Sequence, residues 1–409
     1  MKNVLILTYN FPPDGGPTVQ RVVKFIKYIY HYGYRSIVLT SKHKVETTDN
    51  TLLKEIPEET AIYKTADFGD YCPGEFRNKL LKNFFVPDKQ KFWEYTALKE
   101  VQNIIIDYKI DLIFSTSPPH SVHLTAMKIK SRLNIPWIAD FRDEWTKNPS
   151  FKDFHNKEKN KELEELVVNQ ADHIVVCTQA AADNFKKIYS LDKITVIMNG
   201  FDSEDFESIT NYELRITNEE NCLNILYYGR LSKLHSIDNL LKVMSELKKE
   251  TFVKSFPIKL LVIGNNTKNA WLKKYKNLED DVTFKGYKSH LECLEIAACS
   301  DILLLLATGM DGTEFFPAKV FEYIKLRKPV LGIITKFGEL STFLESYGNS
   351  FLTLENDISD LKRKLLKMIE MKRNGELTLS ENYNFINGYD RKKQAEKLVG
   401  IFNSITSNG

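Results

Sequence analysis

The stretch DGTEFFPAKVFEYIKLRKPV, residues 311–330, contains the strongest local signals in this chain. It follows an apolar run, residues 302–306, which predicts a buried strand. Pro317 predicts the start of a helix, because proline lacks the N–H that has no intrahelical partner in a first turn, and Pro329 predicts its end. The free amides of that first turn and the helix dipole favour binding of an anion such as phosphate.

Two carboxylates bracket this predicted anion site. Glu314 lies in the loop before the helix, and Glu322 lies about one and a half turns into it. A nucleotide-sugar carries a diphosphate between two hydroxyl-rich groups, so the amides would hold phosphate while each carboxylate accepts hydrogen bonds from hydroxyls. The alternative is that neither carboxylate binds a ligand, and that Glu322 lies on a solvated helix face while Glu314 is an ordinary loop residue. The other residues at this helix start that could bind the nucleotide-sugar are Phe316, Pro317, Ala318 and Lys319.

Length and composition predict a two-domain cytoplasmic protein. The 409 residues suit two domains of roughly 200 residues each. A net charge of +3 argues against a general nucleic-acid binder. No apolar stretch approaches the roughly 20 residues that span a bilayer, and residues 4–7 are too short for a secretory core. Five cysteines form no CxxC pair and are expected to be reduced thiols: Cys72, Cys177, Cys222, Cys293 and Cys299.

The N-terminal segment predicts a doubly wound α/β domain. A strand at residues 4–7 is followed by a glycine loop and then by apolar residues at helical spacing up to Gly33. The loop lacks GxGxxG, so a dinucleotide cofactor is not indicated. Gly15 and Gly16 would let backbone amides approach a ligand at the helix start, and a tight turn without a ligand is the alternative.

Two later loops of this domain carry candidate site residues. His120 follows a strand at residues 112–115, where open α/β sheets bind ligands. We expect no metal there, because neither carboxylate nor cysteine accompanies the histidine at ligand spacing. Asp140 and Asp143 follow the next strand and are spaced one residue too far apart for a metal-binding DxD. They would place acceptor hydroxyls or pair with Arg142, and structural pairing alone competes with that interpretation.

The second half of the chain repeats the same pattern. Residues 203–221 are polar and predict a connector, and a strand at residues 223–228 then leads into a glycine loop and a helix. Arg230, Lys233 and His235 lie in this loop and are candidate phosphate-binding cations.

Residues 76–93 interleave basic and aromatic side chains. Such a segment suits an anionic membrane surface. The alternative is an amphipathic helix whose apolar stripe packs on the domain, and both can hold in part.

Several of these motifs together resemble one family. The spacing Glu, seven residues, Glu in the context EFFPAKVFEY resembles the signature of family 4 retaining glycosyltransferases of the GT-B fold. FPPDGG followed by Arg21 is similar to that family, and PPHS and WIADFRD resemble a bacterial surface-polysaccharide subgroup. The resemblance implies two Rossmann-like domains that face each other across a cleft. It places an acceptor domain at residues 1–200, a nucleotide-sugar domain at 201–385, and a C-terminal helix at 386–409 that crosses back to the first domain.

The resemblance also implies roles for individual residues. Glu314, His120 and Arg230 would take part in catalysis, with Lys233 or His235 as the second cation on the diphosphate. The family usually places a lysine where this chain has His235, so the choice between these two residues stays open. Gly286 and Tyr287 would meet the nucleobase. The acceptor would meet Arg21, Asp140, Arg142 and Asp143.

The implied reaction moves a sugar from a UDP-sugar to a saccharide or polyprenyl-diphosphate-linked acceptor, with retention and without metal or cofactor. Capsule, O-antigen or exopolysaccharide assembly is the expected setting. Two alternatives stay open: a UDP-sugar 2-epimerase on the same fold, and a non-catalytic assembly subunit.

Overall fold

The computed structural model divides the chain into two compact units. The N-terminal unit comprises Met1–Asn199 and Arg391–Gly409, and the C-terminal unit comprises Gly200–Asp390. The sequence predicts boundaries at residues 200 and 385. In the structure the second boundary follows Asp390, so the short helix α14, Tyr383–Asn387, lies wholly in the C-terminal unit. The structure describes residues 1–43, 48–68, 85–148, 151, 156–207, 209, 221–232, 235–264, 271, 273–308 and 316–407.

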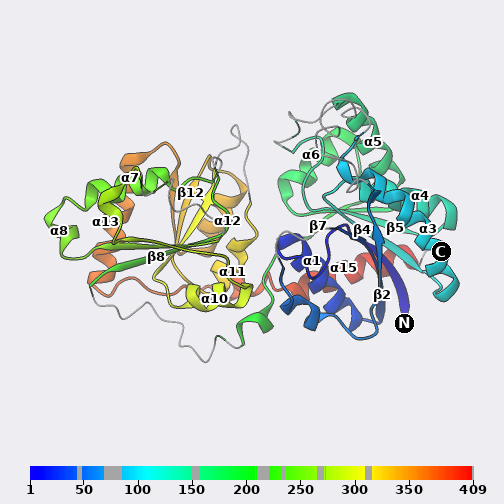
Figure 1. Ribbon diagram of the computed structural model, residues 1–409, viewed down its shortest axis with the longest axis horizontal. Coiled ribbons are helices and arrows are strands. Elements are labelled where there is room, and N and C mark those ends of the chain that lie inside the picture. Colours follow the sequence, from blue (N-terminus) through cyan, green and yellow to red (C-terminus); the bar gives the residue numbers. More distant parts are fainter. Residues whose placement is uncertain are drawn as a thin grey trace. The chain divides into compact units, whose positions relative to one another are not determined.

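A seven-stranded sheet forms the centre of the N-terminal unit, in the order β3-β2-β1-β4-β5-β6-β7 (Figure 1). All its strand pairs are parallel. Every residue of β4 is buried, as expected for a parallel sheet covered on both faces. The strands are β1 Lys2–Leu7, β2 Tyr34–Lys42, β3 Ala61–Ala66, β4 Leu112–Ser117, β5 Trp137–Phe141, β6 His173–Val176 and β7 Ile194–Val196.

Helices cover both faces of this sheet. The helix α15, Arg391–Thr406, returns to the N-terminal unit and packs beside α1, Pro17–Tyr30, where Leu398 and Phe402 join the core. The remaining helices are α3 Trp93–Asp107, α4 Ser121–Leu133, α5 Lys157–Gln170 and α6 Gln179–Tyr189, with the 3-10 turns η1 Thr51–Glu55 and η4 Lys89–Phe92.

The C-terminal unit has a six-stranded parallel sheet in the order β10-β9-β8-β11-β12-β13. Its strands are β8 Leu223–Tyr228, β9 Ile258–Ile263, β10 Val282–Lys285, β11 Ile302–Ala307, β12 Val330–Ile334 and β13 Ser350–Leu354. Its other helices are α7 Asp238–Leu247, α8 Thr251–Lys254, α10 His290–Ala298, α11 Lys319–Lys325, α12 Glu339–Tyr347 and α13 Ile358–Arg373, with the 3-10 turns η6 Ser203–Phe206 and η8 Lys276–Leu278. Two Rossmann-like α/β units of this kind are the predicted fold class.

Two elements differ from the prediction. The sequence predicts no strand at residues 61–66, but Ala61–Ala66 forms the edge strand β3. Its side chains are only partly buried or exposed, so its apolar signal is weak. The predicted helix at Pro317 begins at Lys319 instead, because a tighter turn precedes it: Val320 N–H donates to Pro317 O over 3.1 Å.

Each sheet has one point where the order of strands reverses. In the N-terminal unit it lies between β1 and β4, and in the C-terminal unit it lies between β8 and β11. Open α/β sheets bind ligands in the crevice at the carboxyl ends of the two strands at such a point. The loops after β1, β4, β8 and β11 are therefore the places where a ligand site is expected.

Candidate functional site

The loop after β8 begins with a glycine that the geometry requires. Gly229 has φ of 135°, a conformation that side-chain-bearing residues rarely adopt. A Cβ at this position would lie 3.0 Å from Lys319 Nζ. The glycine thus allows the first turn of α11 to place its lysine directly against the loop that carries Arg230.

Lys319 lies in a largely apolar setting with neutral partners. Its Nζ donates a hydrogen bond to Tyr228 O over 2.8 Å and lies 4.0 Å from the centroid of the Tyr227 ring. Burial lowers the pKa of Lys319 to about 7, although Glu322 and Cys293 act in the opposite direction. Among the described residues, no carboxylate forms an ion pair with this ammonium group.

Glu322 is held by side chains from two other elements. One carboxylate oxygen accepts a hydrogen bond from Tyr228 Oη at the end of β8, and the other lies 2.9 Å from His290 Nε2 at the start of α10. His290 Nδ1 lies 4.0 Å from a carboxylate oxygen of Asp205. The Glu322 side chain is 12% exposed, so this row of groups holds a largely buried carboxylate close to the end of β8.

No local sequence pattern marks Tyr228, His290 or Asp205 as site residues. Tyr228 and His290 are far from Glu322 in the sequence and meet it only in the folded unit, where Asp205 in turn lies beside His290. The position of His290 has one explanation in the sequence, since Ser289 and Glu292 form a capping box that starts α10 there.

The candidate cations of the β8 loop differ in charge and exposure. Arg230 is exposed, and its side chain has no hydrogen bond or ion pair with a described residue. Burial and the nearby Lys319 lower the pKa of His235, which disfavours a positive charge on that ring. Lys233 and Glu314 lie outside the described residues.

The remaining predicted donor-binding residues fall into two groups. Gly286 and Tyr287 follow β10, with open space around the Gly286 Cα and 47% exposure of Tyr287, so both are accessible. Phe316 stacks on Phe321 with ring centroids 5.7 Å apart, and Pro317 is buried while Ala318 caps α11. The aromatic side chain of Phe316 thus packs against the unit, and the backbone after it leads into α11.

The reversal point of the N-terminal unit contains the glycine loop and His120. Gly16 is the N-cap of α1 at φ of 107°, and no atom lies within 4 Å of a Cβ placed there. His120 stacks on Trp145, with ring centroids 4.8 Å apart and an interplanar angle of 2°. Burial lowers the pKa of His120 to about 3, so the ring is neutral at physiological pH. Its Nδ1 is buried and has no hydrogen-bond partner among the described residues.

Arg21 and Asp140 are placed differently from the acceptor-binding role predicted for them. Both side chains are 0% exposed and form a buried salt bridge of 2.8 Å. Arg21 also donates to Met198 O and Ile197 O, and Thr116 Oγ1 donates to Asp140. With no exposed surface, the two side chains cannot contact an acceptor in this structure. They join α1 to the carboxyl ends of β4 and β5 and to the segment after β7.

Arg142 and Asp143 form an ion pair with each other, as the structural alternative predicts, but they remain near the surface. Arg142 Nη2 lies 2.7 Å from Asp143 Oδ2, and the Asp143 side chain is 45% exposed. The Nε of Arg142 is buried without a hydrogen-bond partner in the described part of the chain. These two residues keep accessible polar atoms that Arg21 and Asp140 lack.

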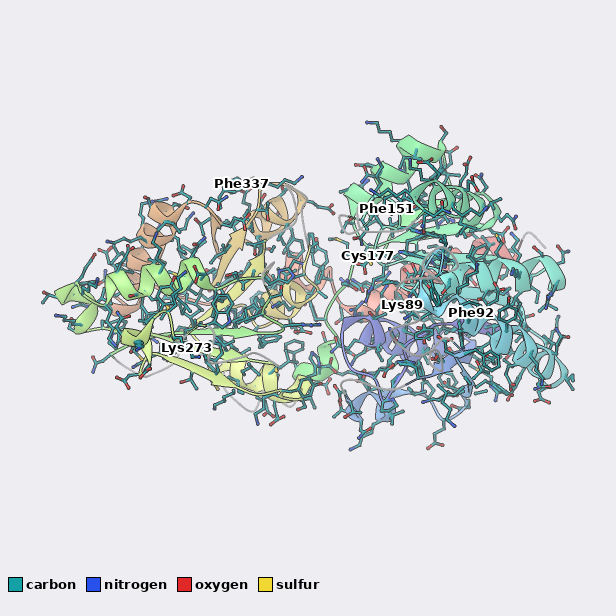
Figure 2. All side chains as sticks on the ribbon, turned by 45° about the horizontal axis from the view of Figure 1, so that its top comes forward. Lys89, Phe92, Phe151, Cys177, Lys273 and Phe337 are labelled. Atoms are coloured by element: carbon teal, nitrogen blue, oxygen red, sulfur yellow. The ribbon has the colours of Figure 1, made fainter. Side chains whose placement is uncertain are left out.

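The predicted membrane segment is only partly described. Residues 76–84 lie outside the described residues. Trp93 is 0% exposed and donates through Nε1 to Thr65, so this aromatic residue belongs to the core. Phe85, Phe92 and Tyr95 contact one another in a row, and Tyr95 is 63% exposed. Figure 2 labels Phe92 and Lys89 in this region. No helix in the described part of the chain is long and apolar enough to cross a bilayer.

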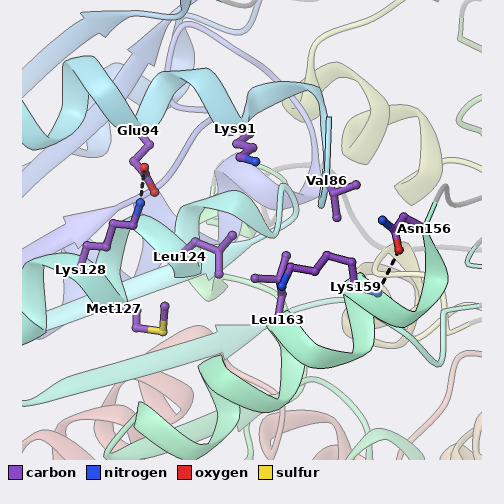
Figure 3. Close-up of a pocket in the computed structure, with 9 residues that line it drawn as sticks. All are labelled: Val86, Lys91, Glu94, Leu124, Met127, Lys128, Asn156, Lys159 and Leu163. Atoms are coloured by element: carbon purple, nitrogen blue, oxygen red, sulfur yellow. Dashed lines mark hydrogen bonds and ion pairs between the residues drawn. The ribbon is translucent and has the colours of Figure 1, made fainter. Parts of the chain in front are cut away.

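A groove of about 460 Å³ lies between α3, α4 and α5 (Figure 3). Leu124, Met127 and Leu163 line it with apolar surface, and Glu94 pairs with Lys128 at its edge. None of the donor- or acceptor-binding residues predicted from the sequence lines this groove.

Comparison with known proteins agrees with this architecture. Residues 65–205 match the model described as Glycosyltransferase Family 4, and residues 213–384 match that of Glycosyl transferases group 1. The chain has the GT-B fold, and each of its two units contains a region that matches a glycosyltransferase family model.

Two curated relatives are glycosyltransferases by name. An uncharacterized glycosyltransferase of Methanocaldococcus jannaschii is 23% identical over 61% of this chain and 62% of its own length. The probable glycosyltransferase WbjE of Pseudomonas aeruginosa is 27% identical over 36% of this chain and 35% of its own length. The chain thus spans less than two thirds of each relative.

Solved GT-B structures match almost the whole chain. Sucrose-phosphate synthase of Thermosynechococcus elongatus has a TM-score of 0.72 at 13% identity, with 100% of both chains covered. HepE of Anabaena, solved in complex with UDP-glucose, has a TM-score of 0.62 at 15% identity and covers 99% of this chain and 100% of its own. A putative UDP-N-acetylglucosamine 2-epimerase of Listeria monocytogenes has a TM-score of 0.58 at 12% identity, covering 100% and 97%.

Proposed function

We propose that the protein is a retaining glycosyltransferase that takes a UDP-sugar as its donor. One observation carries the proposal: Glu322, Lys319 and the exposed Arg230 gather at the reversal point of the C-terminal sheet. A positioned carboxylate beside two cationic side chains suits a ligand that has hydroxyls next to a diphosphate. The bound UDP-glucose of HepE, a protein of the same fold, supports the choice of nucleotide.

The proposed roles follow from the chemistry of the leaving group. Departure of UDP develops negative charge on the diphosphate, and Arg230 and the first amides of α11 would stabilise it. A well-placed donor of this kind contributes roughly 2.7–4 kcal/mol to transition-state stabilisation. Glu322 would accept hydrogen bonds from the ribose hydroxyls, and Glu314 from the transferred sugar. The leaving phosphate would take the acceptor proton on the same face, which accounts for retention.

The N-terminal unit would supply the acceptor side. A neutral His120 can donate or accept a hydrogen bond but cannot act as a strong acid, so we assign it to orienting a sugar hydroxyl. Arg142 and Asp143 are the accessible acceptor-binding candidates. A lipid-linked acceptor on a polyprenyl diphosphate, in surface-polysaccharide assembly, agrees with the partly exposed aromatic row beside Lys89 and Lys91.

A UDP-sugar 2-epimerase is the second candidate, because a putative epimerase shares the fold. An epimerase needs no acceptor, whereas a transferase releases UDP stoichiometrically with glycosylated product.

The test begins with thermal shift against a panel of nucleotide-sugars. A ligand at 100 times its dissociation constant stabilises a protein by roughly 2.7 kcal/mol. We expect UDP-sugars to raise the melting temperature most. Product analysis with the best donor then separates the candidates: a changed sugar without acceptor would indicate an epimerase, and no shift with any nucleotide-sugar would contradict both.

A further inference from the structure

We infer that Lys319 supplies the second positive charge for the donor's diphosphate, opposite Arg230. The inference rests on the proposed function, and it replaces both residues, Lys233 and His235, that the sequence offered for this role. Three observations lead to it: the position of the ammonium group, the identity of its partners, and the state of the competing histidine.

The first observation is the position of the Lys319 ammonium group. The carbonyl that Lys319 binds belongs to Tyr228, the last residue of β8, and the glycine against which its Nζ lies is the next residue along. Both belong to the strand end at the reversal point of the sheet, where a ligand of an open α/β sheet binds. A phosphate held by the backbone of this loop would therefore lie next to the ammonium group as well as next to Arg230.

Among the described residues, no carboxylate forms an ion pair with the Lys319 ammonium group, although Glu322 on the same helix favours its charged form. A lysine has three N–H donors, and Tyr228 O accepts one of them. The nearest carboxylate on the same helix, Glu322, binds Tyr228 Oη and His290. A buried charge without a counterion is costly, so an anionic ligand here gains from pairing with it.

The competing histidine is a weaker candidate. His235 closes a turn in which its N–H donates to Ser232 Oγ and its O accepts from Ser232 N. Its ring is near Lys319, whose positive charge opposes protonation of the imidazole. A neutral ring could donate one hydrogen bond to phosphate but would supply no charge.

A purely structural role for Lys319 is the alternative, in which it only holds the end of β8. The two roles differ in ligand dependence. If Lys319 has only a structural role, its loss should weaken the binding of the nucleoside and of the diphosphate equally, because both use the same strand end. A diphosphate-binding residue would affect UDP and leave uridine nearly unchanged.

The experiment measures binding of UDP by calorimetry, and of uridine by competition against UDP, for wild type and three variants. We expect Lys319→Met to weaken UDP binding about 10- to 100-fold, the range for loss of a charge-assisted hydrogen bond, with uridine affinity within about twofold of wild type. Lys319→Arg should recover part of the loss. Lys325→Met is the matched control: this lysine is on the same helix, donates to the neutral Ser203 Oγ and lies 4.9 Å from the Phe201 ring centroid.

Each outcome decides between the interpretations. Equal loss for UDP and uridine in Lys319→Met, or no loss for either, would overturn the inference and assign the residue to the strand end. A large UDP-specific loss in Lys325→Met as well would show a general charge effect and would also overturn it. If wild type does not bind UDP, the proposed function itself fails. A melting curve of each variant checks that the unit remains folded.

Discussion

Individual side chains of the C-terminal unit explain how a carboxylate and a cation can coexist at the edge of a crevice. Glu322 takes its hydrogen bonds from Tyr228 and His290, while Lys319 takes its own partner from the backbone of β8. The two charged groups on one helix therefore do not neutralise each other by direct contact.

Mutation of the two glutamates should separate binding from turnover. We expect Glu322→Ala to weaken UDP binding at least tenfold, because hydrogen bonds to a charged group contribute about 1.5–3 kcal/mol. Glu314→Ala should chiefly remove turnover, since the loop position would meet the transferred sugar. Calorimetry and steady-state kinetics measure the two effects, with the exposed Glu345→Ala as the control. Equal loss of UDP affinity in both glutamate variants would contradict the assignment.

The affinity for UDP should fall as the pH rises from about 7 to about 9. The pKa of Lys319, lowered to about 7 by burial, means that free protein loses this charge in that range. A bound diphosphate favours the charged form, so binding takes up a proton and weakens by up to about tenfold per pH unit once the lysine is neutral.

The cysteine, tyrosines and histidine around Lys319 have pKa values that are shifted away from that window. Burial raises the pKa of Cys293 to about 12 and raises those of Tyr227 and Tyr228, whereas the pKa of His235 is lowered below its ordinary value. Glu322 faces the lysine from the same helix. Calorimetry in two buffers of different ionisation enthalpy measures the proton uptake. Uptake that persists in Lys319→Met would assign the effect to another group.

The buried Arg21–Asp140 pair connects three parts of the N-terminal unit, because it joins α1 to β5 and to the segment after β7. Such a pair is expensive to break, because one charge is left buried without its partner. We therefore assign these residues to stability of the N-terminal unit. Their neighbours Arg142 and Asp143, which end the same strand region, are the ones that reach the surface.

Breaking this pair should destabilise the protein. Asp140→Asn removes the counterion of a fully buried arginine, and we expect a loss of about 3–5 kcal/mol in the free energy of unfolding. Asp143→Asn, at a side chain that is 45% exposed, should cost less than about 1 kcal/mol. Chemical denaturation of both variants measures the difference. Similar stability of the two variants would contradict the structural role of Asp140.

The segment before α3 should contribute to membrane binding through its charge. Each basic residue near an anionic surface contributes about 1 kcal/mol, and the attraction is screened by salt. We expect sedimentation with anionic vesicles at low salt, reduced when Lys79, Lys82, Lys89 and Lys91 are all changed to Ser. The control changes Lys242, Lys249, Lys254 and Lys273 of the C-terminal unit to Ser. If wild type and the first variant bind equally, or neither binds, the segment serves packing alone.

Both sheets have one point at which the strand order reverses, and the loop after β8 at the reversal point of the C-terminal sheet carries Arg230. Arg230 and Lys319 would neutralise a diphosphate without help from a metal, and Asp140 is already bound to Arg21. Transfer activity should therefore survive EDTA. The measurement is product formation before and after chelation, with Mn²⁺ and Mg²⁺ added back. A loss of transfer activity that Mn²⁺ or Mg²⁺ restores would show that the reaction depends on a metal ion.

The two α/β units, the strand-loop-helix units that open them, and the loops in which a ligand site is expected can all be predicted from the amino-acid sequence. Apolar runs, helical spacing and the positions of glycine and proline are local properties, so they can be recognised one segment at a time. The pairing of polar groups could not be predicted in this way, because it depends on the folded arrangement. Arg21 meets Asp140 across 119 positions, Lys319 meets Tyr228 O across 91, and His290 meets Glu322 across 32. Some candidate residues, such as Arg21 and Asp140, therefore form a buried salt bridge, whereas Arg230 is exposed, because burial and distance arise only when the strands come together in one sheet.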